Sequence, residues 1–429
     1  MPLFAEATRR RFLQGALAAP AILATPRAYG ANNRVRVGVI GLGGRGSWLL
    51  TMALTRAAAS NDVEIAALCD VYQLRLSKAA AKAPGAKTYT HHQDLLAHGG
   101  LDAVLIATPD HWHAPITLAA LDAGLDVYCE KPMTHTLEEA RIVRDRVKAS
   151  GRVMQVGVQG LSWERWHRIR DIVQEGTLGQ IVSLQGTYSR NNPDGDWNWE
   201  INPAAGPDGR GDDHIDWQQW LGAAAPRPFD ADRFFRFRKY WDYSGGIATD
   251  LHYHIVAPFH LAVANDHPSR IAGMGGLWVY NDGRETPDTF LTAADYPGKY
   301  SLLVQSSQVN EIGPRMMLRG TKATMHLGDE WEGPQGRNFT SARIAPETPY
   351  RKQFVEKFGR DELVLEGFGN EGDQKHMDNF IDCVHSRKTP NCDADMGYKV
   401  MTAIDLSVRS YRESKIYLFD PKAERITNA

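Results

Sequence analysis

The sequence has few cysteines, almost no net charge and, past its N-terminus, no long apolar run. Only 4 of its 429 residues are cysteine, which excludes a small disulfide-rich scaffold. Its 49 basic and 51 acidic residues are scattered and leave a net charge of −2, which argues against nucleic acid or an anionic membrane as a partner. No later segment approaches the roughly 20 apolar residues of a membrane helix, so we expect no membrane span.

The cysteines say little about function. Cys69 and Cys129 fall in predicted buried strands, where a small apolar side chain is sufficient. Cys383 and Cys392 are close enough in sequence to pair in an oxidising compartment, but spacing alone does not establish a disulfide.

The N-terminus has the layout of a cleavable export signal. Three arginines at residues 9–11 precede an alanine-rich apolar stretch that ends at Ala24, and Ala28 and Gly30 then offer small residues at plausible cleavage positions. The paired arginines with Phe-Leu behind them resemble the twin-arginine type, which exports folded proteins. We therefore expect residues 1–30 to be a signal and the protein to be periplasmic or otherwise exported. A cytosolic protein with an amphipathic N-terminal helix is the alternative.

A glycine-rich turn follows the first predicted strand, residues 34–40. It opens an apolar helical stretch that runs from Ser47 to about Ala58. In a G-x-G-x-x-G turn the first glycine permits a tight bend, the second lets the backbone approach a pyrophosphate, and the third lets the helix pack on the strand. The cofactor-binding residues predicted here are Gly41, Gly43, Gly44, Arg45 and Gly46.

An acidic residue closes the next apolar run. Asp70 ends this run at about the distance where a carboxylate meets the ribose of a dinucleotide. Because a carboxylate there repels a 2′-phosphate, we expect NAD, with NADP less favoured. A glycine-rich turn in some other α/β protein is the alternative.

Two further predicted strands end in polar residues. The first ends at Thr108 and Pro109, with His113 shortly after, and the second ends at Glu130 and Lys131. Ligands bind at the carboxyl ends of the strands in an open parallel sheet. These residues are therefore expected to line one crevice beside the nicotinamide, although His113 could equally pack behind it.

The sequence resembles the Gfo/Idh/MocA oxidoreductases in the glycine turn and in the stretches ATPDHWH and CEKPMTHTLEEA. The resemblance extends over essentially the whole chain after the signal. The resemblance implies an α/β protein with a Rossmann domain, residues 31–155. It implies a second α/β domain, residues 156–429, with a large, open, predominantly antiparallel sheet often used for oligomer contacts. It also places Lys131 in the active site and expects a later Asp-x-x-x-His pair for substrate binding and acid-base catalysis.

That pair is present as Asp250 and His254. On a helix, a spacing of four places both side chains on one face, close enough to hydrogen-bond. The carboxylate would orient the imidazole, His254 would accept a hydroxyl proton, and Lys131 would stabilise the developing alkoxide or tune the histidine. A helix-capping aspartate and a structural histidine are the alternative.

Other polar residues are weaker substrate-binding candidates. Gln159, Tyr188 and Arg190 fall at predicted strand ends that face the same crevice, and His252 replaces His254 there if the helix is rotated. The His-x-His spacings at 111–113 and 252–254 lack a convincing acidic or cysteine partner, so no metal is expected.

Aromatic residues crowd residues 188–243. Ring faces beside polar groups suit a sugar, whose C–H face stacks while its hydroxyls form hydrogen bonds. The alternative is a long insertion with its own aromatic core. The tryptophans of this region are Trp197, Trp199, Trp217, Trp220 and Trp241.

Export and a nicotinamide cofactor together restrict the chemistry, because the periplasm has no dependable nicotinamide pool. One solution is an oxidoreductase that resembles glucose-fructose oxidoreductase relatives, with tightly bound NAD recycled on sugar or polyol CH–OH groups. A second is an NAD-dependent glycoside hydrolase that works by transient oxidation, elimination, hydration and re-reduction. A third is a cofactor-containing binding protein.

Overall fold

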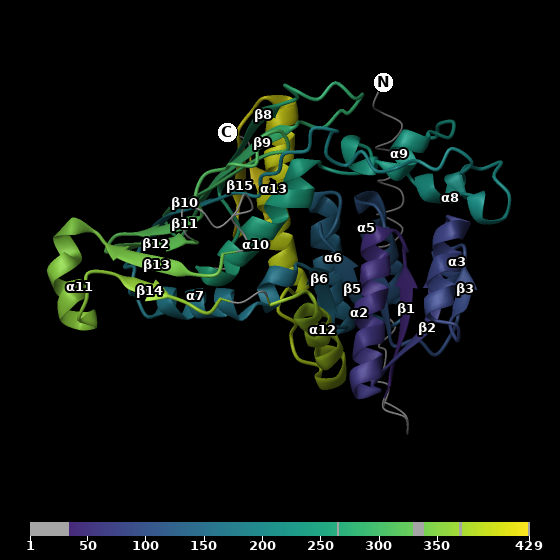
Figure 1. The fold of residues 1–429 in the computed structure, drawn as a ribbon, viewed down its shortest axis with the longest axis horizontal. Coiled ribbons are helices and arrows are strands. Elements are labelled where there is room, and N and C mark those ends of the chain that lie inside the picture. The colour runs from purple at the N-terminus through teal and green to yellow at the C-terminus, as the bar shows by residue number, and fades with distance from the viewer. Residues whose placement is uncertain (1–33, 264–265, 329–338, 369–370, 428–429) are drawn as a thin grey trace.

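The computed structural model describes residues 34–263, 266–328, 339–368 and 371–427, which are arranged around two sheets (Figure 1). The predicted signal, residues 1–30, lies outside the described residues. The expected class, a Rossmann domain followed by an α/β domain with a large open sheet, is confirmed.

The first sheet is parallel throughout, in the order β3-β2-β1-β4-β5-β6. Its central strands are almost fully buried, as expected when helices cover both faces of a parallel sheet. The strands are β1 (Val35–Ile40), β2 (Val63–Cys69), β3 (Lys87–Tyr89), β4 (Ala103–Ile106), β5 (Asp126–Glu130) and β6 (Met154–Gly157).

Helices cover the two faces of this sheet. Apolar residues of α5 and α6 pack on one face, and those of α2, α3 and α12 pack on the other. Thr136 and Glu139 form a capping box at the start of α6. The helices are α2 (Gly44–Ser60), α3 (Gln73–Lys82), α4 (His92–Leu96), α5 (Asp110–Asp122), α6 (Leu137–Ser150) and α12 (Gln374–Ser386).

The second sheet has the order β14-β13-β12-β11-β7-β10-β9-β8-β15-β16 in the described chain. Its neighbours are antiparallel except β7 and β10, which are parallel. The strands are β7 (Ile181–Gly186), β8 (Arg270–Gly276), β9 (Thr289–Tyr296), β10 (Tyr300–Ser307), β11 (Met317–Gly320), β12 (Ala323–Leu327), β13 (Ala342–Pro346), β14 (Leu363–Leu365), β15 (Tyr417–Asp420) and β16 (Arg425–Thr427).

Helices lie between the two sheets (Figure 1). Buried and less buried residues alternate along β9, because one face of an antiparallel sheet packs on helices and the other does not. The long α13 runs along β8 and also contacts α6 of the first domain, so it joins the two parts. The remaining α-helices outside residues 187–247 are α7 (Glu164–Gln174), α10 (Tyr253–Ala262), α11 (Arg351–Phe358) and α13 (Ala394–Glu413), and the 3-10 helices there are η1 (Gln159–Ser162) and η5 (Thr348–Tyr350).

An irregular insertion, residues 187–247, leaves β7 and passes over the first domain before it reaches the π-helix η4 (Ala248–His252). Figure 1 shows its α8 and α9 beyond the ends of α3 and α5. Backbone bonds join it to the first domain, including Asp216 N to Val71 O at 2.9 Å. Its short helices are η2 (Gly211–Asp213), α8 (Trp217–Leu221), α9 (Ala231–Phe235) and η3 (Phe237–Lys239).

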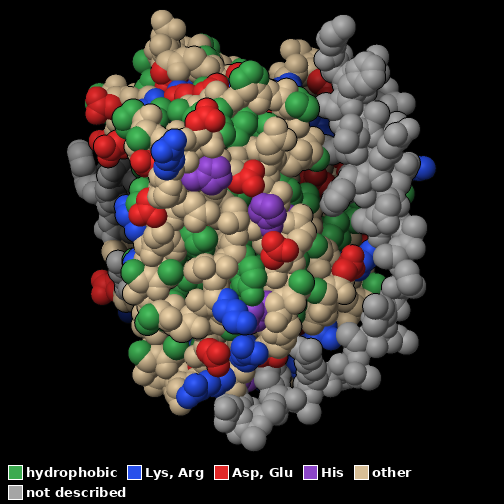
Figure 2. Space-filling view, turned by 90° about the vertical axis from the view of Figure 1, so that its right-hand side faces the viewer, with side chains coloured by type: hydrophobic (Ala, Val, Ile, Leu, Met, Phe, Trp, Pro, Cys, Tyr) green, Lys and Arg blue, Asp and Glu red, His purple; other side chains and the backbone are tan. Residues whose placement is uncertain are grey.

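Acidic and basic side chains both occur on the face drawn in Figure 2, with apolar side chains between them. None of the helices in the described ranges has the length and apolar character needed to cross a membrane. All four cysteines are buried and free, so Cys383 and Cys392 are not joined.

Candidate functional site

A cavity of about 960 Å³ lies at the carboxyl ends of the parallel strands and extends to the second domain. Its lining begins at the glycine turn, passes the ends of β4 and β5, and ends at η4 and α10. The predicted site residues that line it are Gly41, Gly43, Gly44, Arg45, Asp70, Thr108, Pro109, Glu130, Lys131, Gln159, Tyr188, Arg190, Asp250 and His254.

The glycine turn has no room for side chains at two positions. Gly41 has φ +83°, and a Cβ there would lie 2.7 Å from the carbonyl oxygen of Ala107. A Cβ on Gly46 would lie 1.7 Å from the carbonyl oxygen of Gly41. Gly46 therefore lets α2 pack on the turn, as its place in the pattern predicts, but it does not line the cavity.

Asp70 holds the turn in shape while it faces the cavity. Its Oδ2 accepts a hydrogen bond from the Leu42 N–H at 2.6 Å, and its Oδ1 accepts one from the Tyr72 N–H at 2.8 Å. Burial raises the pKa of this carboxyl. A dinucleotide requires a helix N-terminus for its pyrophosphate and a carboxylate for its ribose. The start of α2, with open space at Gly44, and Asp70 at the end of β2 provide these groups, so the residues fit NAD.

Arg45 joins the glycine turn to the end of β5. Its Nε donates to Glu130 Oε1 at 2.7 Å, and its Nη1 donates to Asp373 Oδ2 at 3.0 Å, beside the start of α12. Gln159 lies behind this pair, where its Nε2 donates to the Gly157 carbonyl at 2.9 Å. Both side chains are thus held by the protein while they line the cavity.

Lys131 and Asp250 bring the two domains together at the opposite end of the cavity. Lys131 Nζ lies 2.5 Å from Asp250 Oδ1, and Arg238 Nε donates to the same oxygen at 2.9 Å. Burial alone would raise the pKa of Asp250, but the charges of Arg238, Lys131 and Arg190 hold it well below its ordinary value. Asp250 is therefore an anion that orients two cations.

His254 lies beside a second pair of polar residues. Its ring meets the Tyr188 ring edge-on, with 5.8 Å between ring centres. Arg190 Nη2 donates to the Tyr188 hydroxyl at 3.1 Å, and its Nη1 lies 3.3 Å from Asp196 Oδ2. An imidazole, a lysine ammonium and a phenol thus line the same end of the cavity.

Besides Gly46, two predicted site residues, His113 and His252, do not line this cavity. His113 is buried behind the strand ends, where its Nδ1 lies 2.6 Å from the Pro132 carbonyl oxygen and its Nε2 lies 2.9 Å from that of Thr108. Burial disfavours a charged ring, but Cys129, Asp110 and the Pro132 carbonyl together raise its pKa to about 9. His113 thus holds the two strand ends in place, and its prediction as a cofactor contact is corrected.

His252 is also absent from the cavity wall. It is fully buried, and its Nδ1 lies 3.0 Å from the Thr292 hydroxyl of β9. The predicted rotation that would turn it toward substrate does not occur, because the chain winds as a π-helix through η4 and then as an α-helix from Tyr253. This winding places Asp250 and His254 on the cavity and His252 in the core.

Sequence reasoning missed Arg238. It lies on η3 and reaches Asp250 from twelve residues upstream, within an insertion that has no regular period. In the sequence, Arg238 is only a basic residue within an aromatic stretch. That pattern does not distinguish a side chain that lines a cavity from one on the protein surface.

Most of the aromatic insertion forms a core of its own. Tyr72 of the first domain packs with Trp217, Trp220, Phe234 and Tyr243, and all five side chains are buried. These rings form an aromatic core in the insertion, as the alternative predicts, although Trp220 and Phe234 also line the cavity. Trp197 and Trp199 also line the cavity, so aromatic faces remain available beside the polar groups.

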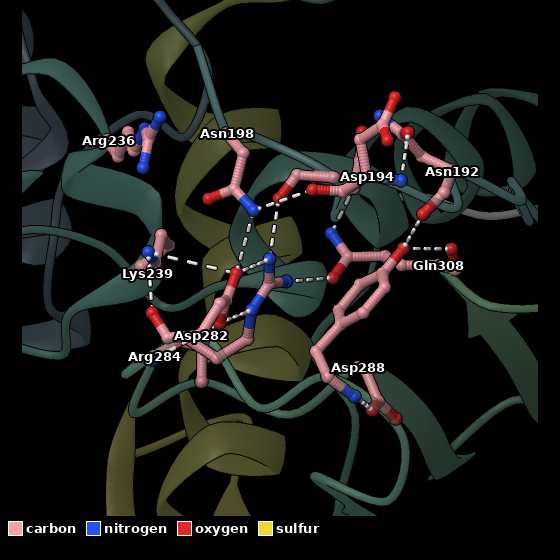
Figure 3. Close-up of polar contacts among 12 residues, drawn as sticks. Asn192, Asp194, Asn198, Arg236, Lys239, Asp282, Arg284, Asp288 and Gln308 are labelled. Atoms are coloured by element: carbon pink, nitrogen blue, oxygen red, sulfur yellow. Dashed lines mark hydrogen bonds and ion pairs between the residues drawn. The ribbon is translucent and has the colours of Figure 1, made fainter. Parts of the chain in front are cut away.

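A buried polar network holds the ends of this insertion (Figure 3). Arg284 donates to Asp282 Oδ2 at 2.8 Å and to Gln308 Oε1 at 2.8 Å. Lys239 Nζ donates to the Asp282 carbonyl at 2.9 Å, and Asn198 Nδ2 donates to Asp282 Oδ2 at 2.9 Å. The loop that carries Trp197 and Trp199 and the turn that carries Arg238 are therefore both fixed to the second domain.

Across the described ranges, no group of three or more His, Cys, Asp or Glu side chains is placed to hold a metal ion.

The fold and the cavity together define a two-domain protein whose first domain binds a nicotinamide dinucleotide. Residues 35–158 match the model "Oxidoreductase family, NAD-binding Rossmann fold", and residues 165–273 match "Oxidoreductase family, C-terminal alpha/beta domain", both of the Gfo/Idh/MocA type. The chain belongs to the Gfo/Idh/MocA oxidoreductase family.

Among curated relatives, an inositol 2-dehydrogenase of Corynebacterium glutamicum (strain R) is 34% identical over 155 residues, 36% of this chain and 45% of the relative. A glycosyl hydrolase family 109 protein of Stenotrophomonas maltophilia (strain K279a) is 34% identical over 197 residues, 43% of this chain and 42% of the relative. The chain thus spans less than half the length of these relatives.

A solved levoglucosan dehydrogenase, in complex with NADH and L-sorbose, has a similar fold. It superposes with a TM-score of 0.67 at 16% identity and covers 90% of this chain and 98% of its own.

Proposed function

We propose that the protein is an NAD-dependent oxidoreductase that acts on a CH–OH group of a sugar or polyol. The observation that carries this proposal is the position of Lys131, Asp250 and His254 in the same cavity as the glycine turn and Asp70. NAD, when bound, supplies the hydride acceptor.

The chain's own groups have distinct roles in this reaction. His254 accepts the proton of the substrate hydroxyl, and the Lys131 ammonium stabilises the alkoxide oxygen as it forms. Asp250 keeps Lys131 in position through their 2.5 Å contact and neutralises part of its charge in the buried site. Trp197 and Trp199 offer ring faces to the C–H face of a sugar.

The twin-arginine-type signal adds a condition to this function. We propose that the protein is exported in its folded state with NAD already bound, and that the cofactor is recycled in place by alternate oxidation and reduction of two substrates. This is the arrangement expected of a relative of glucose-fructose oxidoreductase.

The resident cofactor can be tested directly. The purified protein is denatured, and the released nucleotide is identified and quantified by chromatography. We expect close to one NAD per chain, with little NADP. A protein that is empty, and that needs millimolar NAD for turnover, would contradict the resident cofactor.

A second candidate function is favoured by the glycosyl hydrolase family 109 relative. An NAD-dependent glycoside hydrolase oxidises one hydroxyl transiently, eliminates the glycosidic substituent, adds water and returns the hydride. Incubation with aryl glycosides without added NAD separates the two candidates. Release of the phenol with no net redox change supports the hydrolase, whereas a matched pair of oxidised and reduced products supports the oxidoreductase.

The open sheet of the second domain is the surface we propose for assembly into a homo-oligomer. Met274 and Trp278, on β8 and just after it, are 60% and 70% exposed. Large apolar side chains at such exposure are typical of surfaces that a partner covers.

A further inference from the structure

The substrate end of the cavity holds more positive than negative charge. Lys131 and Arg238 both bind one oxygen of Asp250, and Arg190 lies close enough to lower the pKa of the same carboxyl further. Three cations therefore lie around the Asp250 carboxylate, at the place where the substrate's reacting carbon would lie.

The buried neighbouring acids do not remove this excess, and Glu200, which also lines the cavity, is exposed to water. Asp196 partners Arg190 at 3.3 Å, which leaves three cations and two carboxylates. Asp110 is buried close by, but it lies with His113, whose two ring nitrogens both face carbonyl oxygens and so must both donate. That pair is neutral if Asp110 is ionised and positive if it is protonated. The acids around Arg45 lie on the other side, by the glycine turn.

Arg238 has donors to spare. Its Nε is bound to Asp250, and its two terminal nitrogens bond to no residue in the part of the chain that the structure describes. Its side chain lines the cavity and is 25% exposed. A guanidinium presents its nitrogens in a planar fork that matches the two oxygens of a carboxylate.

The fork is held in place before any ligand arrives. The Thr286 hydroxyl donates to the Arg238 carbonyl at 3.2 Å, and the next residue, Lys239, is fixed in the buried network of Figure 3. Because this turn is already ordered, little conformational entropy would be lost when Arg238 binds a ligand.

We propose that the substrate is a sugar acid, a uronate or an aldonate, and that Arg238 binds its carboxylate. The inference rests on the proposed function, because it assigns the substrate class of the same site. A neutral sugar would leave the two terminal nitrogens of Arg238 without an anionic partner, whereas a carboxylate pairs with both. Arg238 would thereby distinguish acids from neutral sugars, while His254 and Lys131 act on the hydroxyl.

The test compares matched sugars on the full chain with its bound NAD. D-glucuronate is compared with D-glucose, and D-galacturonate with D-galactose, through the absorbance of reduced nicotinamide and through Kd by calorimetry. A charge-assisted hydrogen bond leads us to expect an about 10- to 100-fold preference for the acid. A preference for the neutral sugar, with turnover present, would overturn the substrate class but leave the oxidoreductase proposal standing.

Variants locate the source of the preference. Arg238→Met should remove it, and Arg238→Lys, which keeps the charge on Asp250 but not the fork, should retain only part of it. Arg236→Met is the matched control, because Arg236 donates to the Trp199 carbonyl and to Asp232 and does not line the cavity. Equal loss in Arg236→Met and Arg238→Met would contradict the assignment. If no acid or neutral sugar changes the nicotinamide spectrum of NAD-loaded protein, the proposed function itself fails.

Discussion

Lys131 Nζ and Asp250 Oδ1 are 2.5 Å apart, although they come from different domains and lie 119 residues apart in the chain. The contact joins the end of β5 to the π-helix η4 inside the cavity. Substrate would therefore meet a lysine whose position is set by the second domain.

The first prediction concerns this pair. We expect Asp250→Asn and Lys131→Met each to lower kcat by at least about 100-fold, because the first removes the anion that positions Lys131 and the second removes the cation that stabilises the alkoxide. The double variant should be little worse than either single one, since the two residues act as a unit. Steady-state kinetics of the three variants test this, and additive losses would show that the residues act separately.

The second prediction concerns the proton acceptor. His254→Ala should lose measurable turnover and still release NAD on denaturation, because His254 lies away from the glycine turn. His214→Ala is the control, since His214 contacts the Pro207 carbonyl and does not line the cavity. Wild-type rates in His254→Ala would end the acid-base assignment.

The third prediction concerns a buried histidine. Burial lowers the pKa of His252 to about 3, whereas an unfolded histidine has a pKa near 6.5. The unfolded chain therefore takes up a proton that the folded chain refuses, so this histidine's contribution to stability is complete above about pH 6.5 and declines as the pH falls toward 3.

His252→Asn should destabilise the protein near pH 7.5, because its contacts with Thr292 and Phe290 are altered. The difference from wild type should shrink by about 2 kcal/mol at pH 5, since only the wild type carries the titrating group. Urea unfolding of wild type and variant at pH 7.5 and at pH 5 measures the difference in their free energies of unfolding at each pH. A difference that is the same at both values would show that His252 can be protonated in the folded state.

The fourth prediction concerns the glycine turn. Gly46→Ala should destabilise the first domain and abolish NAD retention, because its Cβ would lie 1.7 Å from the Gly41 carbonyl oxygen. Gly85→Ala is the matched control, since a Cβ there meets no atom within 4 Å. Thermal unfolding and released NAD are measured for both, and a Gly46→Ala protein with full NAD content would show that the turn can open.

The sequence by itself determined the first domain and its ligand. The strand, the glycine turn and the acid at Asp70 are neighbours along the chain, so their spacing alone predicts a dinucleotide-binding turn at the edge of a parallel sheet. Lys131 was found in the same way, because the carboxyl ends of parallel strands meet at one edge. Asp250 and His254 needed the family resemblance as well.

Only the tertiary structure decided which polar groups reach the cavity in the second half of the chain. Arg238 comes from an irregular insertion, and its distance from Lys131 depends on how that insertion crosses the first domain. His113 and His252 carry the right chemistry but point into packed regions, since a helix or a π-turn of slightly different winding moves a side chain from cavity to core. Local spacing specifies local geometry, whereas contacts between distant segments follow from packing that no short pattern encodes.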